Sequence, residues 1–242
     1  MPERSATIVS DLHIGSPYFL REPFLCFLER IPPSHELILN GDVIDDPRRP
    51  LGLQDQRVLR RLREESRQRR VIWIRGNHDG RYTLENPGEI EFAAVCDLGK
   101  RLLVAHGDDF DQVMPRSLAF MMVMKALHGV RVRMGAPPVH VAQWAKKWGR
   151  LYRVLRENVM RNAVRYAREN GYEAVTCGHA HFAEDRMLDG IRYINTGSWT
   201  ETPLFYLVAE QEISLRSLDL PMEVLPAREL PRRIAQHQTR AG

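Results

Sequence analysis

The chain has 242 residues, of which 43% are hydrophobic and 27% are charged, as is ordinary for a globular protein. No apolar run reaches the ~18 residues of a membrane-spanning helix, which argues against an integral membrane protein. Three scattered cysteines exclude a disulfide framework. The first residues lack the basic-then-apolar pattern of a secretory signal, so we expect a cytoplasmic protein.

The net charge of +4 is distributed unevenly along the chain. Residues 112–172 contain twelve Lys or Arg and only two Glu, a net charge of +10, which leaves −6 for the remainder. Such asymmetry predicts an anionic partner for that segment: nucleic acid, an anionic lipid surface or a phosphorylated substrate.

Apolar runs and helical periodicity alternate over the first 105 residues. Strands are expected over 7–10, 36–40, 71–75 and 100–105, and helices over 24–31 and 53–69. A βαβαβ order of this kind predicts a parallel sheet with right-handed crossovers.

The pattern then becomes helical, with a methionine-rich helix expected over 117–128 and apolar residues at helical spacing after Pro137-Pro138. Short strands return over 173–177, 191–194, 204–209 and 213–215, and they predict a second sheet packed on the first. We therefore expect an α/β core formed by residues 1–111 and 172–220. The helical insertion spans 112–171, and the C-terminal tail 221–242 is rich in proline and charge.

Five short blocks of Asp, His and Asn each follow an apolar run. They are Asp11-Leu12-His13, Gly41-Asp42-Val43-Ile44-Asp45, Gly76-Asn77-His78-Asp79, His106-Gly107-Asp108 and Gly178-His179-Ala180-His181. Each block alone is compatible with a turn. Because the carboxyl ends of parallel strands meet at one edge of a sheet, where ligands bind, the five in order predict a shared site.

The residue types fit two divalent ions. Asp11, His13 and His181 suit a first ion, Asp42 can bridge both ions, and a second ion would take the remaining donors, Asn77, His106 and His179. Two ions about 3.5–4 Å apart can activate a water molecule and clamp the attacking and leaving oxygens of a phosphoryl group. The pattern therefore predicts a hydrolase of phosphate esters or anhydrides. Asp, His and Asn donors accept several divalent metals, so the pattern predicts the two ions without naming the element.

The third block also carries candidates for catalysis. His78 can protonate the leaving oxygen or stabilise charge on the phosphoryl group. Asp79 counts with it as a catalytic candidate, and Asp79 and Asp108 are candidate acceptors that orient the histidines. Asp45 and Asp46 either take part in the site or cap the following turn.

The five blocks resemble the signature of the calcineurin-like metallophosphoesterase superfamily over about residues 6–111 and 172–217. The resemblance implies a four-layer αββα sandwich with a helical cap insertion. It also implies a two-metal centre of Mn, Fe, Zn or similar, and a catalytic His78. The ligands that it implies are Asp11, His13, Asp42, Asn77, His106, His179 and His181.

Within the superfamily, the chain looks most like the UDP-2,3-diacylglucosamine pyrophosphatase group of lipid A biosynthesis. In that group the insertion covers the active site and receives acyl chains. Trp144 and Trp148 of the basic insertion suit an amphipathic interface, and with Asn77 and Arg150 they are candidate substrate-binding residues. The implied partners are a lipid-linked phosphorylated substrate and an anionic surface, peripherally at the inner membrane. The group usually has Arg at the position of His78, which indicates a paralogue with a different phosphorylated substrate.

The alternatives differ in the use of the insertion. A broad-specificity phosphodiesterase or phosphatase would act on nucleotides or small phosphoesters. Nucleic acid is not expected, because the aromatic residues of the insertion follow helical packing rather than a stacking platform. A non-enzymatic scaffold would have lost ligands, and here none is missing. An insertion used for dimerisation stays open, as does the oligomeric state.

Overall fold

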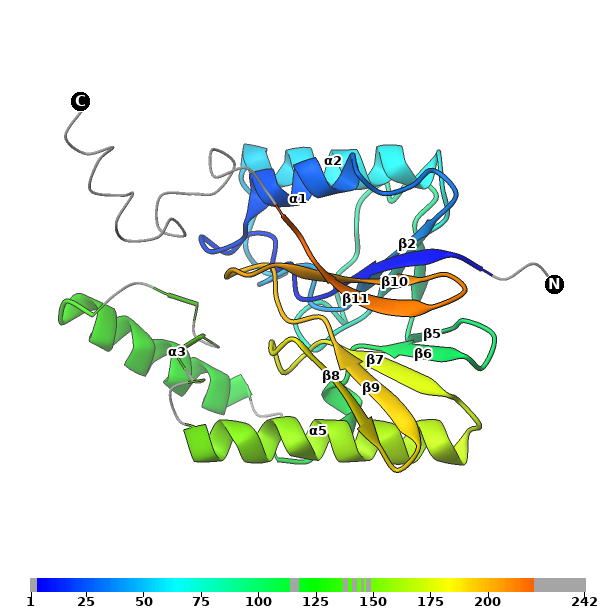
Figure 1. Ribbon diagram of the computed structural model, residues 1–242. Coiled ribbons are helices and arrows are strands. Elements are labelled where there is room, and N and C mark those ends of the chain that lie inside the picture. Colours follow the sequence, from blue (N-terminus) through cyan, green and yellow to red (C-terminus); the bar gives the residue numbers. More distant parts are fainter. Residues whose placement is uncertain are drawn as a thin grey trace.

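The computed structural model describes residues 4–113, 118–136, 139–140, 143–144, 146 and 149–219. Two sheets lie face to face between helices, with α1 (Arg21–Leu28) and α2 (Leu53–Ser66) on one outer face and α5 (Gly149–Glu169) on the other (Figure 1). This is the predicted α/β sandwich of two packed sheets, and both sheets are mixed.

The first sheet has six strands. Their order is β11 (Ile213–Ser217), β10 (Phe205–Ala209), β1 (Ala6–Val9), β2 (Glu36–Asn40), β3 (Val71–Ile74) and β4 (Glu91–Ala93). Strands β1 to β4 run parallel, and for β1, β2 and β3 this agrees with the prediction. β10 pairs with β1 in the antiparallel sense, and β11 pairs likewise with β10.

The second sheet has five strands. Their order is β5 (Val95–Asp97), β6 (Leu102–Ala105), β7 (Ala174–Cys177), β9 (Ile191–Asn195) and β8 (Glu184–Leu188). β6, β7 and β9 are parallel, whereas β5 and β8 are antiparallel at the two edges. The sequence prediction that all the late strands form a second sheet is wrong for β10 and β11, because these two strands return to the first sheet.

Successive side chains of a strand point to opposite faces of the sheet, so each strand of the first sheet contributes to two apolar layers. Ile8 and Ile38 point into the core between the two sheets, whereas Val9 and Leu39 point toward α1 and α2. Strands buried on both faces read as continuous apolar runs, which is why β1, β2 and β3 are visible in the sequence. The three strands β4, β5 and β8 were not predicted; they are short and partly exposed, so no apolar run marks them.

The helices differ from their predicted limits in informative ways. α1 begins three residues earlier than expected, because Pro23 lies in its first turn, where proline is tolerated. α3 (Leu118–Arg133) and α5 both lie within the predicted insertion. The apolar face of α5, with Ala163 and Ala167, packs on the second sheet, so this part of the insertion forms the fourth layer of the sandwich.

Candidate metal centre

The predicted site residues lie just beyond the carboxyl ends of five strands. Asp11 follows β1, Asp42 follows β2 and Asn77 follows β3, while His106 follows β6 and His179 follows β7. Backbone hydrogen bonds join these loops, for example from Asp11 N–H to Gly41 O and from Gly178 N–H to His106 O. Because the strands are parallel, both sheets bring their polar blocks to the same edge of the sandwich.

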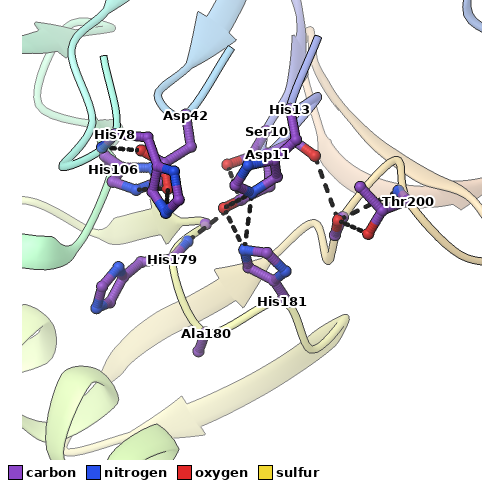
Figure 2. A network of polar contacts seen from close by, with 12 residues as sticks. Ser10, Asp11, His13, Asp42, His78, His106, His179, Ala180, His181 and Thr200 are labelled. Atoms are coloured by element: carbon purple, nitrogen blue, oxygen red, sulfur yellow. Dashed lines mark hydrogen bonds and ion pairs between the residues drawn. The ribbon is translucent and has the colours of Figure 1, made fainter. Parts of the chain in front are cut away.

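The first donor group contains Asp11, His13, Asp42 and His181, all of them buried. One ligand atom from each lies within 4.8 Å of the others. His181 Nε2 is 3.0 Å from Asp11 Oδ1 and 3.2 Å from His13 Nε2. Figure 2 shows the side chains of Asp11 and His181 converging from opposite loops. The structure thus brings together the residues predicted for the first ion, with Asp42 among them.

The second donor group contains Asn77, His106 and His179, and it also reaches Asp42. Asn77 Oδ1 lies 2.9 Å from His179 Nδ1 and 3.3 Å from His106 Nε2. His106 Nε2 lies 3.4 Å from Asp42 Oδ2. Because Asp42 lies within reach of both groups, it could bridge two ions, as the sequence predicts.

Each histidine of the second donor group has a hydrogen-bond partner on the ring nitrogen that points away from the site, and this partner determines which nitrogen faces the site. His106 Nδ1 donates to the Asn40 carbonyl at 2.9 Å, so Nε2 is left for a ligand. His179 has the opposite arrangement, because its Nε2 lies 2.9 Å from Asp111 Oδ2 and its Nδ1 faces Asn77. The buried carboxylate of Asp111 was missed by the sequence analysis, although the acidic run after His106 was a possible signal.

His78 lies beside the donor groups. Its Nδ1 donates to the backbone carbonyl of Asp45 at 2.7 Å, and its Nε2 lies 3.8 Å from Asp42 Oδ2. The Asp45 carboxylate lies 3.2 Å from His13 Nδ1. Of the two readings left open for Asp45, its geometry therefore supports participation in the site, while Asp46 accepts hydrogen bonds from Arg48 in the following turn.

Asp79 has a different setting from the one expected. Its carboxylate accepts hydrogen bonds from the N–H groups of Val43, Ile44 and Gly76 and from Trp73 Nε1. These bonds tie the loop after β2 to the loop after β3. Asp79 thus fixes the loops that carry Asp42 and His78, and none of the hydrogen bonds that it accepts from the described residues comes from a histidine. Asp108 lies in the short helix η1 (Asp108–Phe110), after His106.

Backbone strain is concentrated at the metal centre. In the described part of the chain, eight non-glycine residues have positive φ, and five belong to the two donor groups: Asp11, His13, Asp42, His179 and His181. Positive φ is uncommon for non-glycine residues, although Asp and His adopt it more readily than most, and five cases at one site are a marked concentration. Strain gathered on predicted ligands is typical of a functional site.

The pKa shifts in the first donor group favour the protonation states that bind a cation. Burial would raise the pKa of Asp11, but His181 and His106 outweigh burial and lower it. Burial lowers the pKa of both His13 and His181. The carboxylate is therefore ionised and the two imidazoles are neutral at pH 7, which is the protonation state that metal ligands require.

In the second donor group, Asp42 and His106 stabilise each other's charged form. Burial opposes ionisation of Asp42, yet His106 and His78 hold the pKa of its carboxyl well below the usual range. Burial also opposes protonation of His106, but Asp42 raises its pKa well above the ordinary value. Binding of a cation by His106 therefore requires release of a proton.

A divalent cation fits the chemistry of these residues. Asp11 Oδ1 is buried and accepts no hydrogen bond from the described residues, although His181 Nε2 lies 3.0 Å away. A carboxylate oxygen deprived of water is costly to bury without a partner. Neutral imidazole nitrogens around such an oxygen form the donor set of a Zn, Mn or Fe site.

The predicted substrate-binding residues are distributed more widely. Asn77 lies in the second donor group. Trp144 is half-buried, with its ring 5.5 Å from that of His128 and 5.8 Å from the Arg131 guanidinium. Arg150 is exposed near the start of α5, and Trp148 lies outside the described residues. Their proposed roles stay predictions.

Residues 5–183 match the calcineurin-like phosphoesterase family. The chain belongs to this family. It is therefore a hydrolase of phosphoester bonds, and the family uses a two-metal centre. Placed on the sandwich of a calcineurin-like phosphoesterase, the two donor groups are its candidate ligands.

Solved structures with similar folds are distant in sequence. A predicted phosphoesterase from Streptococcus pneumoniae is 14% identical, with 90% of this chain and 91% of that chain covered and a TM-score of 0.41. The phosphoesterase Yfce from E. coli is 19% identical, with 89% and 100% covered and a TM-score of 0.44. Vacuolar protein sorting 29 from Cryptosporidium parvum is 14% identical, with 90% and 92% covered and a TM-score of 0.47. No curated protein sequence matches the chain.

Proposed function

We propose that this calcineurin-like phosphoesterase cleaves a phosphoanhydride or phosphodiester bond in a lipid-linked nucleotide. The reaction would be similar to that of the UDP-2,3-diacylglucosamine pyrophosphatase group, which releases UMP and a diacylglucosamine 1-phosphate. The enzyme would act from the cytoplasm at an anionic membrane surface, with two manganese ions as the expected cofactors and iron or zinc as alternatives.

An exposed apolar row along α3 carries this proposal. Val123, Leu127 and Val130 of α3 and Met134, directly after its last residue, follow one another at helical spacing and are 51–83% exposed. Figure 1 places α3 on the side of the sandwich at which β1 ends. A contiguous apolar row on a surface is typical of a binding site, and acyl chains are a ligand that it suits.

The Lys and Arg side chains in the segment 112–172 would bind anionic groups next to the apolar row. Arg133 is exposed at the end of α3, and the segment as a whole carries a net charge of +10. Such a segment is attracted to phosphate groups and anionic headgroups. Among the described residues, no helix is both long and apolar enough to cross a membrane. Peripheral contact is therefore the form of association proposed.

The chain's own residues would divide the work of hydrolysis. When bound, two divalent ions would supply an activated water and neutralise the phosphoryl oxygens. Asp11, His13 and His181 would hold one ion, Asn77, His106 and His179 the other, with Asp42 between them. The carbonyl of Asp45 holds the proton of His78 on Nδ1, so Nε2 is the atom that would carry a proton to the leaving oxygen.

A substrate panel tests the proposal. Purified enzyme with manganese is assayed on UDP-2,3-diacylglucosamine in mixed micelles and on bis-p-nitrophenyl phosphate. The double substitution Leu127→Glu and Val130→Glu should reduce hydrolysis of the lipid-linked substrate at least tenfold and leave the small diester unaffected. Val154→Glu on α5 is the matched control, because Val154 is equally exposed, at 54%. Equal loss on both substrates would contradict a lipid-binding α3.

The second candidate is a broad-specificity phosphodiesterase or phosphatase. Its supporting observation is His78, which occupies the position at which the pyrophosphatase group usually has Arg. In this case turnover of nucleotides and small phosphoesters should match or exceed turnover of the lipid-linked nucleotide, and detergent or liposomes should have no effect.

A further inference from the structure

The insertion places one of its histidines in the wall of the metal centre. His140 is only 7% exposed. Its ring lies 5.0 Å from that of His13 and is stacked at 5.6 Å on that of His181. Tyr18 packs on it from another side at 6.0 Å. A residue outside the five blocks is thus in contact with two of the candidate ligands.

Asp45 lies where these histidines meet. His140 Nε2 is 3.8 Å from Asp45 Oδ1, and the same oxygen is 3.2 Å from His13 Nδ1. The backbone carbonyl of Asp45 accepts the hydrogen bond from His78 Nδ1. One residue therefore contacts a candidate ligand, the candidate proton donor and the insertion.

Two further contacts hold the insertion and the start of α5 against loops of the site. Lys146 Nζ forms an ion pair with Glu201, in the loop between β9 and β10. The Tyr152 hydroxyl donates to the carbonyl of Ala180, which stands between His179 and His181. With the contact between His140 and Asp45, three described residues, His140, Lys146 and Tyr152, thus contact three separate loops of the site.

We propose that His140 is a positioning residue of this active site. By packing against Asp45 and the rings of His13 and His181, it holds the His13 imidazole and, through Asp45, the His78 imidazole in their working orientations. Partners beyond the ligands set the tautomer and direction of metal-binding histidines, and their loss weakens binding or activity about 10-fold to 100-fold. The inference rests on the roles proposed for His13 and His78.

The first test uses the metal-free protein and needs no activity. In ¹⁵N–¹H spectra of the imidazoles, His13 and His78 of the wild type should carry their proton on Nδ1, because the Nδ1 of His78 donates to the Asp45 carbonyl and the Nδ1 of His13 lies 3.2 Å from the Asp45 carboxylate. His140→Ala should shift His13, and to a smaller extent His78, toward a mixture of tautomers. His140→Phe, which keeps a ring against His181, should give an intermediate shift.

His35→Phe is the matched control. Like His140, His35 is buried; its ring nitrogens are hydrogen-bonded to Thr7 and Glu210, and it lies before β2, at the end opposite to the metal centre. Its loss should leave the spectra of His13 and His78 unchanged. A change of equal size in this control would show that loss of any buried histidine produces the effect, and would overturn the proposal.

The second test is turnover of bis-p-nitrophenyl phosphate with manganese. His140→Ala should lower kcat about tenfold or more with KM nearly constant. A higher KM with constant kcat and unchanged spectra would mean that His140 contacts the substrate, and would refute a positioning role. Wild-type spectra and wild-type kcat would refute it as well. If the alanine variant does not fold, the phenylalanine variant decides, and if the wild type does not cleave this diester, the spectra alone decide.

Discussion

Replacement of Gly178 by Ala tests how closely the two sheets approach at the metal centre. A Cβ at this position would lie 1.7 Å from Ser10 Oγ and 2.2 Å from Asp11 Oδ2. The backbone of Gly178 itself would accept alanine, since its φ lies outside the left-handed region. The effect is therefore purely steric.

The size of the effect follows from these distances. Ordinary contact begins at 3.4 Å, so the Ser10 hydroxyl must retreat by about 1.7 Å and the Asp11 carboxylate by about 1.2 Å. Overpacking costs about 1–3 kcal/mol, and a buried polar group that loses its partner costs about 1–3 kcal/mol. A destabilisation of about 3 kcal/mol corresponds to a decrease in Tm of about 6–12 °C for a protein of this length.

Gly178→Ala should impair metal binding more severely than it lowers the free energy of unfolding. Ligand distances must fit within about 0.2 Å, and the expected displacement of Asp11 is several times larger. Gly178→Ala should therefore lack the first ion when metal content is measured by mass spectrometry, while thermal unfolding reports Tm.

Two controls sharpen this test. Gly129→Ala in α3 meets no atom within 4 Å and should change stability by less than about 1 kcal/mol. Adding Ser10→Gly to Gly178→Ala removes the shortest clash, so Tm should recover in part, whereas metal content should stay low because the Asp11 contact remains. Wild-type Tm together with wild-type metal content in Gly178→Ala would refute the close approach.

Further predictions concern the ligands and their partners. Asp42→Ala should leave less than about 1% of turnover and bind less of both ions, because Asp42 belongs to both donor groups; wild-type turnover would contradict bridging. His78→Ala should lower kcat about 10²-fold to 10⁴-fold at unchanged metal content, and parallel loss of metal would make His78 a ligand. Asp111→Asn should weaken metal binding about 10-fold to 100-fold by titration calorimetry, since Asp111 orients His179; unaltered affinity would argue against that role. Manganese at 100 times its Kd should stabilise the fold by about 2.7 kcal/mol, and an unchanged Tm would argue against a preformed site.

The sequence alone located the chemistry of this protein. Strands buried on both faces give unbroken apolar runs, and polar blocks that follow such runs must emerge at the carboxyl edge of a parallel sheet. For this reason Asp11, Asp42 and Asn77 could be assigned to one site before their neighbours were known. The identity of each side chain then limited the ligand to a divalent cation.

Tertiary structure decided the contacts between segments that are far apart in the chain. Asp111 meets His179 across 68 residues, and His140 meets Asp45 across 95, because stacking of the two sheets and folding of the insertion bring them together. The return of β10 to β1 is likewise set by pairing partners and not by any local pattern. Periodicity records which face of an element is buried, but not which other element covers it. The candidate metal ligands could therefore be named from the sequence, whereas their contacts with Asp111 and His140 are seen only in the folded chain.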